Sequence, residues 1–138
     1  MGDVMLGRLV NQALKTRDPG YVWGDTLPLL RAADLRVCNL ECVLSDRGRP
    51  WSVPPKVFHF RSDAKNAAVL SAAGIDMVSL ANNHVLDYEY VALLDMLEIL
   101  ERSGIGYCGA GRDREAARRP ALVERKGIRV ALLAATDN

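Results

Sequence analysis

The chain has 138 residues, the usual size of one domain, and its hydrophobic fraction of 49% and charged fraction of 25% exclude a disordered chain as the default. The 18 Lys and Arg residues and 17 Asp and Glu residues give a formal charge of +1. The sequence therefore carries no bulk electrostatic signature of nucleic-acid or membrane binding, and any anionic partner has to be recognised locally.

Targeting and cysteine signals are sparse. No apolar stretch approaches the roughly 20 residues that span a bilayer, and no signal peptide is visible, so we expect a cytoplasmic chain as the sequence stands. The cysteines Cys38, Cys42 and Cys108 are an odd number without a secretion signal, which argues against a disulfide framework. Cys38 and Cys42 suggest a metal pair, but no second Cys or His pair accompanies them, and buried thiols are the favoured interpretation.

In the first half of the chain, apolar runs and turn signals alternate in the manner of βα units, which predicts an α/β fold with a mostly parallel sheet. The expected elements are a helix over Leu6–Thr16, a helix over Thr26–Ala33 with Asp25 as its N-cap, a strand over Leu35–Asn39, an irregular connection over Ser45–Pro55 and a strand over Lys56–Arg61.

The second half of the chain continues the alternation and ends in a hairpin. The expected elements are a helix over Asp63–Ala73 ended by Gly74, a strand over Ile75–Ala81, a helix from Tyr90 to Ser103-Gly104, a strand over Ile105–Tyr107, a loop at Gly109-Ala110-Gly111, a helix over Arg112–Arg118, and a hairpin of Ala121–Arg125 and Ile128–Ala134 around Lys126-Gly127.

Three polar clusters stand where predicted strands end: Gly2-Asp3, Asn39-Leu40-Glu41 and Asn82-Asn83-His84. Loops at the ends of strands in an open α/β sheet converge on one crevice. Asp, Glu, Asn and His supply oxygen and imidazole ligands to Mn, Mg, Fe or Zn, so the sequence predicts a divalent metal site.

Each cluster also has a plain structural explanation when it is taken singly. Asp3 is suited to capping a following helix, Glu41 to a solvated loop, and Asn82-Asn83 to a turn beside a hydrogen-bonded His84. Their joint placement at successive strand ends favours the metal site.

The same clusters carry a family resemblance. Gly2-Asp3-Val4-Met5-Leu6-Gly7-Arg8, Asn39-Leu40-Glu41 and Ser79-Leu80-Ala81-Asn82-Asn83-His84-Val85-Leu86-Asp87-Tyr88 resemble, in order, three motifs of the CapA-type family of poly-γ-glutamate capsule synthesis. Gly109-Ala110-Gly111 and Thr136-Asp137-Asn138 fit the same pattern. The resemblance covers essentially the whole chain, and it implies that residues 1–138 are the N-terminal portion of one domain with a calcineurin-like metallophosphatase fold. That fold is an α/β/β/α sandwich, incomplete in this chain.

The resemblance also implies roles for individual residues. Asp3, Glu41 and Asn83 would bind metal, with two divalent ions (Mn, Fe, Zn or Mg) in the full-length protein, and His84 would act catalytically beside the scissile group. An anionic substrate, either a phosphate ester or an acidic polymer, would meet Arg8, Asn39 and Asn82. Nucleic acid is not an expected partner.

Two positions depart from the expected pattern. Met5 occupies the place of a metal-binding His of the phosphoesterases, and Glu89 follows Asp87-Tyr88 where the family usually has Gly. Of the remaining candidates, Lys56 and Arg61 are either anion-binding or solvated, and His59 is expected to have a structural or surface role rather than to be a ligand.

Two functions stay open at this stage. One is a metal-dependent hydrolase of the phosphoesterase type; the other is a non-catalytic capsule or cell-envelope factor that binds polymer in the same crevice. Because no apolar strand precedes Gly2-Asp3 and further histidines are expected in a second half, we also expect residues 1–138 to lack the first strand, to be inactive alone and to be marginally stable.

Overall fold

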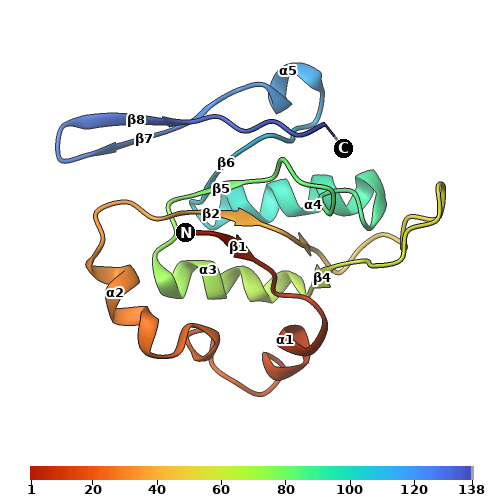
Figure 1. Cartoon of the computed structure of the whole chain (residues 1–138), viewed down its shortest axis with the longest axis horizontal. Coiled ribbons are helices and arrows are strands. Elements are labelled where there is room, and N and C mark those ends of the chain that lie inside the picture. Colours follow the sequence, from red (N-terminus) through yellow and green to blue (C-terminus); the bar gives the residue numbers. More distant parts are fainter. Residues whose placement is uncertain (138) are drawn as a thin grey trace.

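A computed structural model of the chain describes residues 1–137, and its centre is a four-stranded parallel sheet (Figure 1). The spatial order of the strands is β1 (Asp3–Val4), β2 (Val37–Leu40), β5 (Met77–Ser79) and β6 (Gly106–Cys108). Their register aligns Asp3, Asn39, Ser79 and Cys108 in one row across the sheet. The α/β class with a parallel sheet is therefore confirmed.

The chain also forms five α-helices and two 3-10 helices among the described residues. They are α1 (Arg8–Ala13), the 3-10 helix η1 (Tyr21–Thr26), α2 (Leu27–Ala32), the 3-10 helix η2 (Ala64–Asn66), α3 (Ala67–Ala73), α4 (Glu89–Arg102) and α5 (Arg114–Ala117). The apolar spacing that predicted α4 is confirmed, since the helix buries Met96, Leu97 and Leu100 completely. Gly74 ends α3 in a left-handed conformation with a φ of 69°, as predicted.

The two faces of the sheet have different coverings. Side chains of β2 alternate, so that Cys38 joins the core that α3 and α4 complete, while Val37 points to the opposite face. On that opposite face, Met77 packs with the hairpin of β7 (Ala121–Arg125) and β8 (Ile128–Leu132). The sheet is thus covered by helices on one side and by a hairpin on the other.

Turn geometry confirms the predicted hairpin. Lys126 and Gly127 both have positive φ angles, 50° and 75°, as a two-residue turn matched to the twist of an antiparallel pair requires. A second small sheet pairs β3 (Val43–Leu44) with β4 (Arg61–Ser62) in parallel. The three cysteines are free and buried, as expected.

Two predicted elements are wrong or too long near the N-terminus. The helix over Leu6–Thr16 is confined to α1, because Lys15 and Thr16 bond three residues back in tight turns. Asp25 does not cap α2: Thr26 occupies the N-cap, and its hydroxyl donates to the Trp23 carbonyl instead of capping the helix.

Two further expectations concern strands. The strand over Lys56–Arg61 is wrong except for Arg61, because the Phe60 N–H donates to the Asp87 carboxylate rather than to a neighbouring strand. The expected absence of a first strand is also wrong, because Asp3 and Val4 themselves form β1 beside β2. Within residues 1–137, no helix has the length and apolar character that crossing a membrane requires.

Candidate functional site

Side-chain amides connect the three polar motifs at one end of the parallel sheet. The Asn39 amide donates to Asp3 Oδ1 at 2.9 Å, and the Asn82 amide donates to Asn39 Oδ1 and to the Leu40 carbonyl, both at 3.0 Å. Asn82 is buried, and both of its donor hydrogens are engaged in these bonds. The structure therefore brings the predicted clusters together, with Asn82 as the internal bridge between β2 and the loop after β5.

His84 lies at the centre of this arrangement and is buried. Its backbone N–H donates to Asn82 Oδ1 at 3.0 Å, and its ring stacks on Phe60 with centroids 4.0 Å apart. On one side of the ring, Nδ1 lies 2.7 Å from Asp87 Oδ2; on the other, Nε2 faces Glu41 Oε1 at 3.9 Å. A carboxylate only accepts, so the Asp87 contact places a proton on Nδ1, and Nε2 is the ring nitrogen that faces Glu41.

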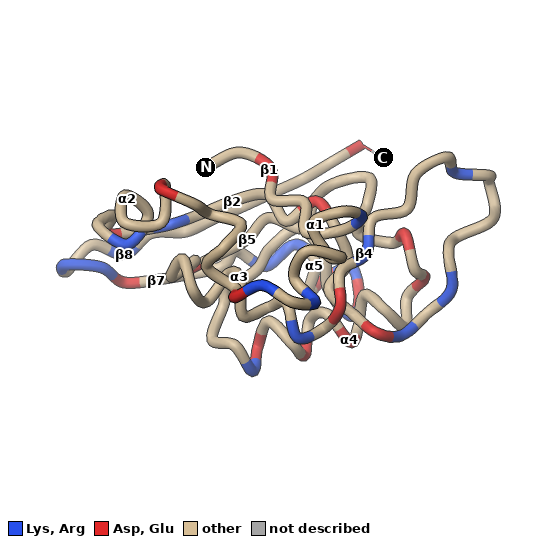
Figure 2. The backbone as a smooth tube through the Cα atoms, turned by 90° about the horizontal axis from the view of Figure 1, so that it is seen from below, with Lys and Arg blue, Asp and Glu red and all other residues tan. Residues whose placement is uncertain are grey.

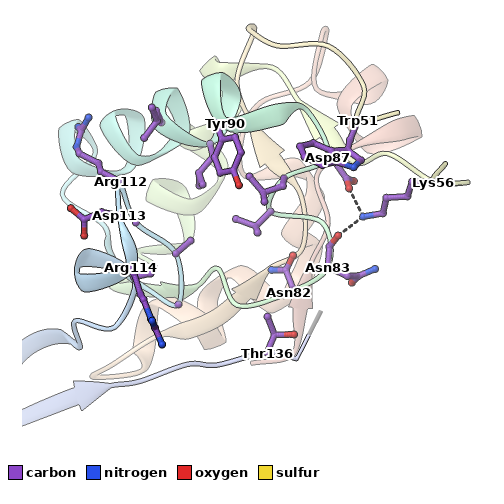
Figure 3. A pocket seen from close by; sticks show the side chains of 18 of the residues that line it. Trp51, Lys56, Asn82, Asn83, Asp87, Tyr90, Arg112, Asp113, Arg114 and Thr136 are labelled. Atoms are coloured by element: carbon purple, nitrogen blue, oxygen red, sulfur yellow. Dashed lines mark hydrogen bonds and ion pairs between the residues drawn. The ribbon is translucent and has the colours of Figure 1, made fainter. Parts of the chain in front are cut away.

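Asp87 holds this histidine through a fully buried carboxylate. Besides His84, it accepts from the Phe60 N–H at 2.6 Å and pairs with the Lys56 ammonium, which also donates to the Asn83 carbonyl (Figure 3). A buried carboxylate needs a countercharge and filled hydrogen-bond sites, and Lys56 and Phe60 provide them.

Sequence reasoning assigned no role to Asp87, although it stands in the third motif. The signal that was available is its position three residues after His84 in the same polar turn. Phe60 was missed as well, because nothing in the local sequence shows that it stacks on a histidine 24 positions away.

The remaining predicted residues lie at the surface of the site. The Asn83 side chain is exposed next to His84, and the Arg8 guanidinium lies over the Phe58 ring at 5.7 Å from its centroid. Arg8 also has a φ of 54°, which is uncommon for a residue other than glycine. His59 Nε2 lies 2.7 Å from the Trp51 carbonyl, in agreement with the structural role expected for it.

The donor set fits part of a metal shell and not a complete one. No three His, Cys, Asp or Glu side chains among residues 1–137 are grouped so as to hold a metal ion. Glu41 and His84 face each other, and Asp3 is fixed in place by Asn39. Met5 turns its sulfur to the Gly7 N–H at 3.1 Å.

A cavity of about 870 Å³ lies beside the loop over residues 80–88, called here the His84 loop, which connects β5 to α4. Three motifs that are distant in the sequence line it: Asn82-Asn83, Gly109-Ala110-Gly111 and Thr136 (Figure 3). Its remaining wall is largely apolar and includes Trp51 and Tyr90, whose rings meet edge to face at 6.5 Å. The fourth motif and Thr136 of the fifth motif therefore share one cavity with Asn82 and Asn83 of the third motif.

Comparison with known proteins gives consistent matches. The family described as "Bacterial capsule synthesis protein PGA_cap" matches residues 1–138. Over 88% of the chain, the sequence is 35% identical to a probable polyglutamine synthesis accessory protein of Mycobacterium tuberculosis, covering 40% of that protein. Over 99% of the chain, it is 28% identical to the capsule biosynthesis protein CapA of Bacillus anthracis and 24% identical to the PGA biosynthesis protein CapA of Bacillus subtilis, covering 34% and 36% of those proteins. The chain thus spans between a third and two fifths of these relatives.

Proposed function

Because this chain belongs to the family of bacterial capsule synthesis proteins described as PGA_cap, we propose that it serves in the synthesis of a capsule polymer of the poly-γ-glutamate type. The names of relatives from two bacilli and a mycobacterium support this assignment, since they refer to capsule, PGA or polyglutamine synthesis. The chemistry that follows is argued from the residues of the site.

The carrying observation is the ordered His84, with Nδ1 bound by Asp87 and Nε2 directed toward Glu41. An imidazole held in this way is suited to giving a proton to, or taking one from, an oxygen placed at Nε2. We therefore propose hydrolysis of the phosphoesterase type, with His84 as the catalytic group and a phosphate ester or an acidic polymer as the substrate. Asp87 and Lys56 act through His84 and are positioning residues.

We also propose that Asp3, Glu41 and Asn83 contribute to binding a divalent metal, with donors from elsewhere completing its shell. When bound, such an ion would polarise a substrate oxygen and lower the pKa of a water molecule. Asn39 and Asn82 orient Asp3 and the His84 loop, and Arg8 lies within the first motif as the cation for an anionic substrate. The helices on one face of the sheet and the hairpin on the other are compatible with a metallophosphatase-like sandwich.

A second candidate is a polymer-binding factor without catalysis. Met5 in place of a histidine favours it. In that case the crevice would bind an acidic polymer, and His84 would contribute hydrogen bonds alone.

The two candidates are separated by activity and binding assays on the protein that contains this chain. Phosphodiester, phosphomonoester and poly-γ-glutamate substrates are offered with Mn²⁺ or Zn²⁺, and His84→Ala is compared with the exposed variant Glu115→Gln. Hydrolysis that His84→Ala abolishes and Glu115→Gln preserves, with both proteins folded by circular dichroism, supports the enzyme. Stoichiometric binding of poly-γ-glutamate without any hydrolysis supports the binding factor and overturns the catalytic proposal.

A further inference from the structure

The segment over residues 47–62, called here the 47–62 loop, follows β3, ends with β4 and projects from the body of the molecule (Figure 1). Apolar side chains are concentrated on its projecting part: Val53, Val57 and Phe58 are 75%, 85% and 55% exposed, beside the exposed Pro54 and Pro55. Single exposed apolar residues are ordinary, but three large ones within six positions of one projecting loop mark an interaction surface.

The charge of this loop has a single sign. Residues 47–62 contain four basic residues and no Asp or Glu: Arg47, Arg49, Lys56 and Arg61. In Figure 2 the projecting part of the loop carries blue segments and no red one. Lys56 is committed to Asp87, and Arg47 pairs with Asp95 at 3.5 Å. Neither Arg49 nor Arg61 has an acidic partner within residues 1–137, and the Arg61 guanidinium lies over the Tyr88 ring at 4.2 Å from its centroid and donates to the Arg47 and Gly48 carbonyls.

The base of the loop is fixed, so that its tip is presented outward. The Trp51 N–H donates to the Asp87 carbonyl at 2.9 Å, and His59 bonds to the Trp51 carbonyl at 2.7 Å. The Phe60 N–H and the Lys56 ammonium both reach the Asp87 carboxylate. A loop that is held in its binding conformation loses little conformational entropy when it meets a partner.

We propose that the 47–62 loop docks on an anionic lipid surface, with Val53, Val57 and Phe58 entering the boundary of the acyl chains and Arg49 and Arg61 contacting headgroups. Apolar side chains flanked by arginines match the two parts of that surface, since hydrocarbon lies below and negative charge lies at the level of the guanidinium groups. This contact is peripheral and needs no membrane-spanning helix.

A lipid partner fits better than a protein partner for a reason of size. A stable protein interface buries about 1,200–2,000 Å², whereas one narrow loop with three large apolar side chains offers a small fraction of that area. A bilayer has no such requirement, because insertion of a few apolar groups combines with electrostatic attraction. The inference uses no catalytic assumption, so it stands or fails separately from the proposed function.

The test is co-sedimentation of the purified protein with vesicles of phosphatidylcholine alone or mixed with phosphatidylglycerol. We expect at least about tenfold stronger binding to the anionic vesicles, weakening as salt is raised, because about 1 kcal/mol is gained for each basic side chain near such a surface. Val57→Asp with Phe58→Asp should abolish binding, and Arg49→Glu should weaken it by about fivefold or more. The matched control is Leu29→Asp with Leu122→Asp, which alters two exposed leucines outside the loop and should leave binding unchanged.

Three results would overturn the proposal. One is the absence of binding to anionic vesicles at low salt, and another is equal binding by the Val57→Asp, Phe58→Asp variant. The third is light scattering in which the wild-type protein is dimeric and the loop variant monomeric, because the occupant would then be a second copy of the chain. Circular dichroism of each variant shows whether it is folded, and the exposure of every substituted side chain favours retention of the fold.

Discussion

The Asp87 side chain both orients the His84 imidazole and stabilises the fold. Its carboxylate is fully buried, and it meets the His84 imidazole, the Phe60 N–H and the Lys56 ammonium. Removing one partner of a buried pair leaves the other charge without compensation, which costs more than the pair contributes in net terms. The Asp87 carboxylate, which orients the proposed catalytic histidine, therefore also holds the 47–62 loop against the His84 loop.

Asp87→Asn should lower the free energy of unfolding by about 3 kcal/mol, since the amide keeps a hydrogen-bond acceptor but leaves the Lys56 charge unpaired. Urea titration followed by circular dichroism measures the change. Glu115→Gln is the matched control, because the Glu115–Arg119 pair is exposed and should contribute less than about 1 kcal/mol. Equal losses in the two variants would show that Lys56 and Asp87 do not form the buried pair.

The backbone at Glu89 has a conformation that glycine adopts more easily than glutamate does. Glu89 stands where the resembling family usually has Gly, and its φ of 66° lies in the left-handed region that side chains with a Cβ atom rarely adopt. Glu89→Gly should therefore raise the free energy of unfolding by about 1 kcal/mol. Glu98→Gly in the interior of α4 should lower it by a similar amount, because a glycine there adds conformational entropy to the unfolded chain and removes the exposed ion pair between Glu98 and Arg112. Urea titration of both variants should give shifts of opposite sign.

The buried thiols should be chemically silent. Burial raises the pKa of Cys38 to about 11 and of Cys42 to about 12, and it also raises the pKa of Cys108. Only the thiolate reacts with disulfide reagents, so at pH 8 we expect no labelling of the native protein and labelling of all three thiols in urea. Because the folded pKa values lie above the ordinary value of 9.0, the associated stability is fully present below pH 9 and is lost as the pH rises toward 12. Rapid labelling of the native protein at pH 8 would contradict this burial.

At the scale of elements, the loop after β6 depends on a close backbone approach. Gly109 has a φ of 88°, and a Cβ atom at this position would lie 2.8 Å from the Ala81 nitrogen and 2.6 Å from the Ala81 Cβ. Gly109 therefore allows the loop over residues 109–111 to lie against the segment that leads into Asn82. The contact connects the fourth motif of the sequence to the third.

Gly109→Ala should lower the free energy of unfolding by about 1 kcal/mol more than Gly104→Ala does. Gly104 also has a positive φ, 67°, but has no heavy atom within 4 Å of the added Cβ, so its variant reports the left-handed conformation alone. The difference between the two variants then measures the close approach, for which the cost of overpacking is typically 1–3 kcal/mol. Urea titration of both variants gives that difference. Equal losses of unfolding free energy in the two variants would show that the loop over residues 109–111 moves away from the segment at Ala81 without a free-energy cost.

The sequence predicted elements whose signals are local and missed contacts that join distant segments. The β7–β8 hairpin, α4 and the glycine that ends α3 follow from turn chemistry and helical spacing, and all are confirmed. The strand over Lys56–Arg61 was wrong because an alternating pattern does not show where backbone groups bond, and Phe60 bonds to Asp87 across the fold. Burial of Asp87 depends on the same tertiary contact, so its role could not be predicted from spacing.

At the scale of the whole molecule, the residues of the candidate site come from the ends of β1, β2 and β5 and from the 47–62 loop. Asp3, Asn39 and Asn82 are joined by amides, and Glu41 and His84 face each other over the same edge of the sheet. The predicted convergence of the strand ends is thus present in the structure. The chain spans 34–40% of the curated relatives described above, so the donors that would complete a metal shell are sought in a longer polypeptide.

Residues 1–138 alone should bind Zn²⁺ or Mn²⁺ weakly and should not hydrolyse a phosphodiester. Among the described residues no three His, Cys, Asp or Glu side chains are grouped so as to hold a metal ion, whereas a stable zinc site in proteins uses three or four protein ligands. Isothermal titration with each metal should give at most one weak event, which Glu41→Gln removes and the exposed variant Glu115→Gln preserves. A longer chain that includes these residues and matches the length of the curated relatives should bind the metal tightly and unfold more cooperatively, since metal that binds only the folded state adds to stability. Tight binding of two metals and phosphodiester hydrolysis by residues 1–138 alone would show that the donor set is complete within this chain.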